Sequence, residues 1–184
     1  HDARSGKMHI GVVDEDKFLQ HNLARHALYH DKVGLNKADA IIKQISDMFE
    51  TDSTKGLRAY AMSVEDVTDN VFEYYEWLVD SSASLLVQNW LSKKVLPATL
   101  KVSRCEIADD GRLGLLYIEG EKRNPRIDDL INMAYYSAIV NDALKSWRRR
   151  DSQRVYSTID VGLGCSSTTT VMPDDIIYLH SSVF

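Results

Sequence analysis

The sequence predicts an α+β fold, a small and mainly antiparallel sheet packed against four or five helices. Three observations carry this prediction. A long apolar-patterned run covers residues 64–94, a two-strand pattern follows over residues 98–119, and a second long helical pattern covers residues 127–150. Apolar residues three and four positions apart are typical of helices, and alternating ones are typical of strands.

The N-terminal third predicts two strands and two helices. The short apolar run 8–13 contains β-branched residues, which favour a strand. Apolar residues at helical spacing then predict a helix over residues 15–30. Asn36 is a good N-cap for a second helix over residues 37–50. After a polar loop, residues 57–62 alternate loosely and predict another strand.

Residues 64–94 predict a helix that is apolar over so wide an arc that it packs on more than one side. Ser63 and Asp66 nearly match a capping box at its start. The small residues 81–84 (SSAS) interrupt it, and serine forms helices poorly, so a kink, a break into two helices or a close helix crossing remain alternatives. We expect this segment to be central to the fold.

The stretch 98–119 predicts a β-hairpin. Residues 98–107 and 111–119 are apolar-patterned strands, and an Asp-Gly turn signal lies between them. The helix over residues 127–150 begins with acidic residues and ends with three arginines, which its macrodipole favours. Strands are expected at 154–161 and 176–183, and the intervening 162–170 is expected to be a loop or an irregular edge.

Composition indicates one globular domain over residues 8–184, preceded by a disordered or cloning-derived tail over residues 1–7. The chain has 184 residues, is 44% hydrophobic and 27% charged, and carries a formal net charge of −5. It contains no apolar run long enough for a membrane span. Its two distant cysteines do not make a disulfide framework, so a reducing, cytoplasmic location is expected.

Charge is uneven along the chain, with an acidic first half and a basic stretch over residues 93–154. The basic side chains could contact phosphates, and interleaved aromatic residues could stack on bases. The two ends of the 127–150 helix are too far apart for a single small patch, and the chain as a whole is acidic. The candidate nucleic-acid contacts are Lys145, Arg148, Arg149, Arg150 and Arg154 at one end, and Lys122, Arg123 and Arg126 at the other.

Two metal-site candidates lie near the N-terminus. His26 and His30 are four residues apart, so on the expected helix 15–30 both rings share a face and could hold Zn²⁺ with a ligand from elsewhere. No glutamate lies between them, so the metalloprotease motif lacks its base. Asp14, Glu15 and Asp16 follow a strand and could hold Mg²⁺, although acidic residues also suit the first turn of a helix.

The stretch 162–170 (GLGCSSTTT) combines glycines with hydroxyl side chains, and Cys165 could act as a nucleophile. Neither a lysine nor a helical pattern follows, so a phosphate-binding P-loop is not indicated.

No catalytic motif stands out, and no cofactor is expected. The sequence therefore predicts a non-enzymatic interaction or assembly module, viral or bacterial, that binds itself or a partner protein through a helix face or the C-terminal strand. Two alternatives remain. One is a nucleic-acid-binding protein that uses residues 122–154, and the other is a metal-dependent hydrolase that uses His26 and His30.

Overall fold

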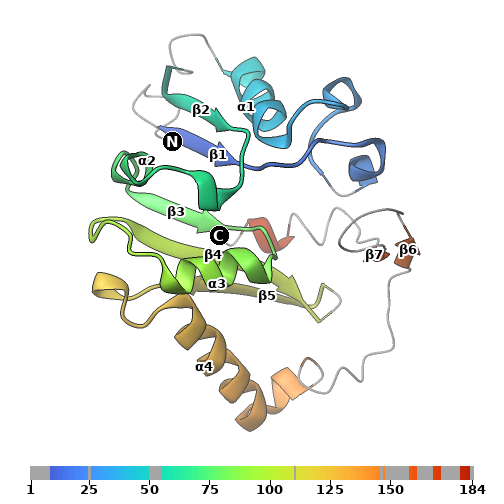
Figure 1. Ribbon diagram of the computed structural model, residues 1–184. Coiled ribbons are helices and arrows are strands. Elements are labelled where there is room, and N and C mark those ends of the chain that lie inside the picture. The colour runs from blue at the N-terminus through green and yellow to red at the C-terminus, as the bar shows by residue number, and fades with distance from the viewer. Residues whose placement is uncertain are drawn as a thin grey trace. The chain divides into compact units, whose positions relative to one another are not determined.

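A computed structural model describes residues 9–24, 26–49, 55–109, 111–145, 147, 158–160, 168–170 and 179–182. Figure 1 shows the chain with its elements labelled. Its contacts divide into two compact units, residues 1–71 and 72–184. The α+β class predicted from the sequence is confirmed, and each unit is described by itself.

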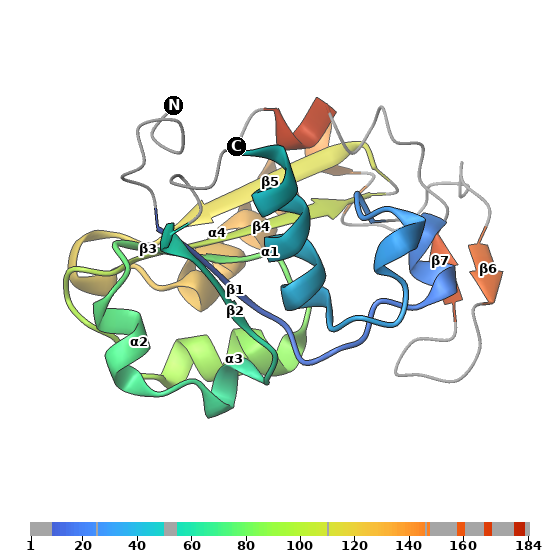
Figure 2. The same ribbon diagram turned by 90° about the horizontal axis from the view of Figure 1, so that it is seen from above.

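Unit 1 is built on a strand–helix–strand motif. Strands β1 (Ile10–Val13) and β2 (Leu57–Tyr60) pair in parallel, with Ile10 opposite Leu57. Helix α1 (Lys37–Met48) lies between them in sequence and packs against both strands (Figure 2). Both predicted strands and the predicted second helix are thereby confirmed, with slightly shorter bounds.

The predicted helix 15–30 is wrong. The described residues form two short 3-10 helices instead, Gln20–Ala24 and His30–Lys32. The reason is a non-local pairing, because the Phe18 N–H donates to the Leu35 carbonyl at 2.8 Å and the Gly34 N–H donates to the Phe18 carbonyl at 2.7 Å. These bonds hold the segment after β1 against the segment before α1. The Phe18 ring is fully buried there, packed with Leu28, Ala40 and neighbouring apolar residues.

Unit 2 contains a three-stranded sheet in the order β3-β4-β5. Strand β3 (Trp77–Asp80) pairs in parallel with β4 (Lys101–Ala108), and β4 pairs antiparallel with β5 (Leu113–Ile118). The β4–β5 pair is the hairpin predicted over residues 98–119, with Gly111 at a φ of 86° in its turn. That φ lies in the left-handed region, which glycine adopts at little cost.

The long helix predicted over residues 64–94 is wrong. The segment holds a 3-10 turn (Val64–Asp66), the short helix α2 (Asp69–Glu73), strand β3 and helix α3 (Leu85–Lys93). Residues 81–84 form the connection between β3 and α3, and the Ser84 hydroxyl caps α3 by accepting from the Val87 N–H. The break suggested by these small residues is therefore present, but a strand precedes it.

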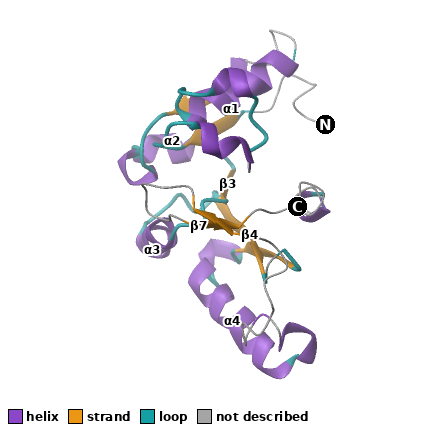
Figure 3. Ribbon diagram, turned by 90° about the vertical axis from the view of Figure 1, so that its right-hand side faces the viewer, coloured by secondary structure: helices purple, strands orange, loops and turns teal. Residues whose placement is uncertain are grey.

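Helix α4 (Ile127–Val140) begins where the sequence predicted and ends ten residues before the predicted end at Arg150. A 3-10 turn, Asp142–Leu144, follows, and residues 148–150 lie outside the described part of the chain. A 3-10 segment, Glu121–Arg123, precedes it. Helix α4 packs against α3, β4 and β5, and Figure 3 shows these helices beside the sheet.

The C-terminal stretch contains a short antiparallel pair, β6 (Thr158–Asp160) with β7 (Thr168–Thr170). The strand predicted over 154–161 is confirmed where it is described. The strand predicted over 176–183 is wrong at residues 179–181, which form a helical turn. The described strands form separate small sheets with parallel and antiparallel pairs, so the single, mainly antiparallel sheet is also wrong. The prediction of one domain stays a prediction.

Within the described part of the chain, helices are all too short or too polar to cross a membrane.

Candidate functional site

The carboxyl end of β1 carries a cluster of charged side chains. Asp14 follows the strand directly, and its Oδ1 accepts from the N–H of Asp16 at 2.9 Å. Asp16 Oδ2 accepts from Lys37 Nζ at 2.7 Å, and Lys37 is the first residue of α1. The cluster therefore joins the end of a strand to the start of a helix, and it combines two carboxylates with one ammonium.

Asn36 fixes the backbone of this cluster. Its Nδ2 donates to the carbonyls of Asp14 at 2.8 Å and Asp16 at 3.1 Å. Its Oδ1 accepts from the N–H groups of Ala38 and Asp39, as expected of the predicted N-cap. One side chain thus ties the loop after β1 to the first turn of α1.

The cluster is open on its acidic side. The side chain of Asp16 is 67% exposed, whereas that of Lys37 is only 12% exposed. Glu15 is also exposed. Among the residues that the structure describes, no three histidine, cysteine or carboxylate side chains come together as a metal site would need. The two aspartates could supply at most part of a Mg²⁺ shell, with a ligand's oxygens completing it.

The histidine pair does not share a helix face. His26 lies outside both 3-10 helices, and its ring packs edge-on against Phe18 with centroids 5.6 Å apart. His30 begins the second 3-10 helix and is exposed. The geometry on which the zinc hypothesis and the hydrolase alternative depended is therefore not formed.

Beside His30, Lys32 is a buried lysine with two carboxylate partners. Its Nζ lies 2.6 Å from Asp31 and 3.3 Å from Asp47, and its side chain is 5% exposed. The hydrogen bond to Asp31 raises the pKa of Lys32, and the same bond lowers the pKa of Asp31. The two ion pairs of Lys32 anchor the loop before α1.

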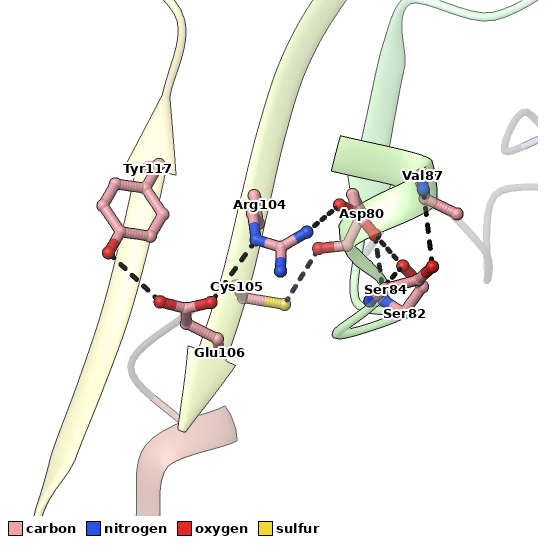
Figure 4. A network of polar contacts seen from close by, with 8 residues as sticks. All are labelled: Asp80, Ser82, Ser84, Val87, Arg104, Cys105, Glu106 and Tyr117. Atoms are coloured by element: carbon pink, nitrogen blue, oxygen red, sulfur yellow. Dashed lines mark hydrogen bonds and ion pairs between the residues drawn. The ribbon is translucent and has the colours of Figure 1, made fainter. Parts of the chain in front are cut away.

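Unit 2 holds a second, closed polar network (Figure 4). Arg104 of β4 pairs with Asp80 at the end of β3, and their side chains are 4% and 3% exposed. The other oxygen of Asp80 accepts from the N–H and hydroxyl of Ser82 at 2.9 and 2.7 Å. Arg104 Nε also donates to Glu106 at 3.4 Å, and Glu106 accepts from the Tyr117 hydroxyl at 3.2 Å. Each carboxylate therefore has its partners within the fold.

The environment of this network suppresses ionisation of its neighbours. Burial, followed by the charge of Asp80, raises the pKa of the Cys105 thiol. Burial, followed by the charge and hydrogen bond of Glu106, raises the pKa of Tyr117 well above its usual range. Since nucleophilic cysteines depend on a lowered pKa, Cys105 has the character of a structural thiol.

The predicted basic set is only partly described. Lys145 pairs with Asp142 at 2.7 Å, whereas Arg148, Arg149, Arg150 and Arg154 lie outside the described residues. At the other end of α4, Arg123 is buried and bonded within the fold. Lys122 is exposed, and Arg126 is half-buried. The nucleic-acid assignment of this set stays a prediction. Cys165 also lies outside the described residues, although β7 forms the end of its hydroxyl-rich segment.

Sequence reasoning found the acidic residues after β1 but missed Lys37, Asp80 and Arg104. One signal was available for Asp80. It ends a short apolar run and is followed by serines, and Asp14 likewise ends the apolar run of β1. An apolar strand that ends in aspartate is thus common to both units.

A search against protein-family models finds no match for this chain. A curated relative, the ATP-dependent ubiquitin transferase-like protein Cap2 of Enterobacter hormaechei subsp. hoffmannii (strain UCI 50), is 27% identical over 109 residues. The match covers 56% of this chain and 18% of the relative, so the chain spans less than a fifth of that protein. The chain is therefore distantly similar to part of a bacterial protein of this kind.

Proposed function

We propose that this chain is part of an ATP-dependent ubiquitin transferase-like protein and that the charged cluster of unit 1 contributes to ATP binding. The relative supports the class, because its name describes ATP dependence. The ion pair between Lys37 and Asp16, at the meeting point of β1 and α1, is the observation that carries the assignment. On this proposal the chain acts in an enzyme, in place of the non-enzymatic role predicted from the sequence.

The position of the cluster supports a nucleotide. In open sheets with parallel strands, ligands bind outside the carboxyl ends of the strands. β1 and β2 are parallel, so their carboxyl ends lie at the same edge of their sheet. The start of α1 lies there too, with its first N–H groups bonded to Asn36 and Asp16, so it would favour a phosphate through the helix macrodipole.

The residue types support the same ligand. A carboxylate near the end of a strand can accept hydrogen bonds from ribose hydroxyls, and Asp14 and Asp16 are placed to do so. The Lys37 ammonium, now paired with Asp16, would exchange that partner for a phosphate oxygen. Mg²⁺ bound to ATP would be shared between the phosphates and an aspartate.

Lys37→Gln tests the proposal. MgATP should raise the melting temperature of the wild-type chain, and Lys37→Gln should remove most of that rise without much change in the melting temperature without ligand. Lys43→Gln is the matched control, because Lys43 is exposed on the same helix. A wild-type chain that MgATP leaves unchanged, or a Lys37→Gln chain with the full rise, would refute the assignment.

A second candidate is the interaction or assembly role predicted from the sequence, and the outer face of α4 supports it. The face opposite the buried Ile127 and Ala138 carries exposed apolar side chains, namely Met133, Tyr136, Ile139 and Val140, which are 59–68% exposed. A helix with apolar side chains on two opposite faces is typically packed against neighbours on both sides. A second copy or a partner protein would cover it.

Light scattering tests self-association through this face. A chain that forms dimers should become monomeric on Tyr136→Glu, whereas Lys145→Glu, beyond the end of α4, should leave the dimer intact. A dimer that survives Tyr136→Glu would exclude this face as its interface.

A further inference from the structure

A small cleft opens in unit 2 between the end of α3 and the start of α4. It encloses about 140 Å³. Its lining is half aliphatic and half cationic, and it consists of Val95, Leu96, Ala98, Lys122, Arg123 and Arg126. Val95 is the accessible aliphatic residue of the lining, since it is 85% exposed whereas Leu96 is 7% exposed.

Arg123 is the structural member of the lining. Its Nη1 donates to the Lys94 carbonyl at 2.7 Å and its Nη2 to the Leu91 carbonyl at 2.6 Å. These carbonyls belong to the last turn of α3, where helical partners are missing. Glu119 receives the remaining bonds from Arg123 and neutralises its charge, and the two side chains are 2% and 7% exposed. Arg123 therefore caps α3 and has no charge to offer a ligand.

Lys122 and Arg126 are two cations of the lining that form no ion pair with any described residue. Arg126 uses one Nη1 hydrogen on the carbonyl of Ser92, and Asp129 accepts from its backbone N–H rather than from its guanidinium. Lys122 is exposed, and within the described part of the chain its ammonium makes no hydrogen bond or ion pair. Among the residues that the structure describes, most of the donors of these two side chains therefore have no acceptor.

The backbone of Lys122 is strained. Its φ of 54° and ψ of 32° lie in the left-handed region, where a side chain is disfavoured and glycine is not. Residues held in such conformations cluster at functional sites. A lysine at this position keeps a charge at the mouth of the cleft at the expense of backbone strain.

We propose that this cleft binds a carboxylate carried beside an aliphatic side chain, as at the C-terminus of a peptide. The carboxylate would bond Lys122 and Arg126, and the side chain would contact Val95 and Leu96. A phosphate of a nucleic acid fits less well, because the lining has no aromatic ring for a base and is too small for successive phosphates. Capture of a terminal carboxylate is a recurring mode of peptide recognition.

Fluorescence anisotropy tests the ligand. The probe is a fluorescein-labelled hexapeptide that ends in Leu-Val with a free carboxylate. Two comparison peptides are the same sequence with an amidated end, and an amidated peptide with an internal glutamate beside leucine. The free terminus should bind at least about tenfold more tightly than the amidated one, a difference of about 1.4 kcal/mol. Equal binding of the internal-glutamate peptide would assign the carboxylate to acidic side chains, and equal binding of the plain amidated peptide would overturn the proposal.

Lys122→Gly separates binding from folding. It removes the cation and relieves the left-handed strain, so the melting temperature should rise while affinity for the free-carboxylate peptide falls at least fivefold. Lys145→Gln is the control and should leave affinity unchanged. Unchanged affinity in Lys122→Gly would overturn the proposal. The proposal would also fail if inorganic phosphate displaced the peptide as effectively as acetate does. The site lies wholly in unit 2 and is measured without nucleotide, so its failure is distinguishable from failure of ATP binding.

Discussion

The most buried ion pairs differ between the two units. In the described part of unit 1 each ion pair has one largely buried and one exposed member, as Lys37 (12% exposed) with Asp16 (67%) and Lys32 (5%) with Asp31 (64%) illustrate. In unit 2 the pairs of Arg104 with Asp80 and of Arg123 with Glu119 are buried on both sides. A closed pair has no bonding capacity left for a ligand, whereas an open pair can exchange its exposed member.

This difference shows why a polar cluster is by itself a poor guide to function. The network around Arg104 has as many charged groups as the cluster at the end of β1, yet its carboxylate oxygens are bonded within the fold. We therefore assign ligand binding to the open cluster and stability to the closed one.

Arg104→Met should give the largest effect. It would leave the Asp80 carboxylate buried without its cation, which typically costs about 3–5 kcal/mol of unfolding free energy. Urea denaturation measures this loss. Lys145→Met is the control, because the side chains of Lys145 and its partner Asp142 are 44% and 90% exposed, and such pairs contribute at most about 1 kcal/mol.

The double variant Arg104→Met with Asp80→Asn removes both charges and should recover part of the lost stability. A loss from Arg104→Met no larger than that from Lys145→Met would mean that the buried pair is not closed, and the comparison between the units would fail.

Asn36→Ala should give an intermediate effect of about 1–2 kcal/mol, because it removes the N-cap of α1. Asn36→Asp separates the two roles of this side chain. The aspartate keeps the acceptor for the Ala38 N–H but loses the donor to the carbonyls of Asp14 and Asp16. Hydrogen exchange should therefore show a protected α1 and a loosened end of β1.

Asn132→Ala serves as the control, because Asn132 is exposed in the middle of α4. A similar stability loss in both variants would argue against a special role for Asn36.

The sequence predicted those elements whose signals are local. The hairpin follows from a turn signal between two apolar runs, and α1 follows from its cap at Asn36. Strand β3 could not be predicted in this way, because its partner β4 lies more than twenty residues further along the chain. A short apolar run such as WLVD fits a buried strand or a helix equally well by periodicity.

The same limit applies to the candidate site. The acidic residues after β1 are adjacent in sequence and were recognised, whereas Lys37 reaches Asp16 only because the backbone of Phe18 pairs with that of Leu35. That pairing also prevents the helix expected over residues 15–30, and with it the shared face of His26 and His30. One non-local contact thus accounts for a missed site residue and for the absence of the helix face on which the metal hypothesis depended.

The smallest effect is expected from Asp31→Asn, and it depends on pH. The hydrogen bond from Lys32 lowers the pKa of Asp31 below its usual 3.8. The pair therefore stabilises the fold above about pH 3.8, and this contribution is lost as the pH falls through the lowered pKa. Asp31→Asn should reduce the melting temperature slightly at pH 7, and the difference from wild type should shrink as the pH falls below 3.8.

Solvent around the exposed Asp31 screens the pair, so the change should be far smaller than that of Arg104→Met. Glu15→Gln is the control, since Glu15 is exposed and should give no pH-dependent difference. A loss at pH 7 as large as that of Arg104→Met would mean that the half-open pairs of unit 1 stabilise the fold as much as closed ones. The pair of Lys37 and Asp16 would then resist exchange of its partners. That outcome would count against ATP binding at the end of β1.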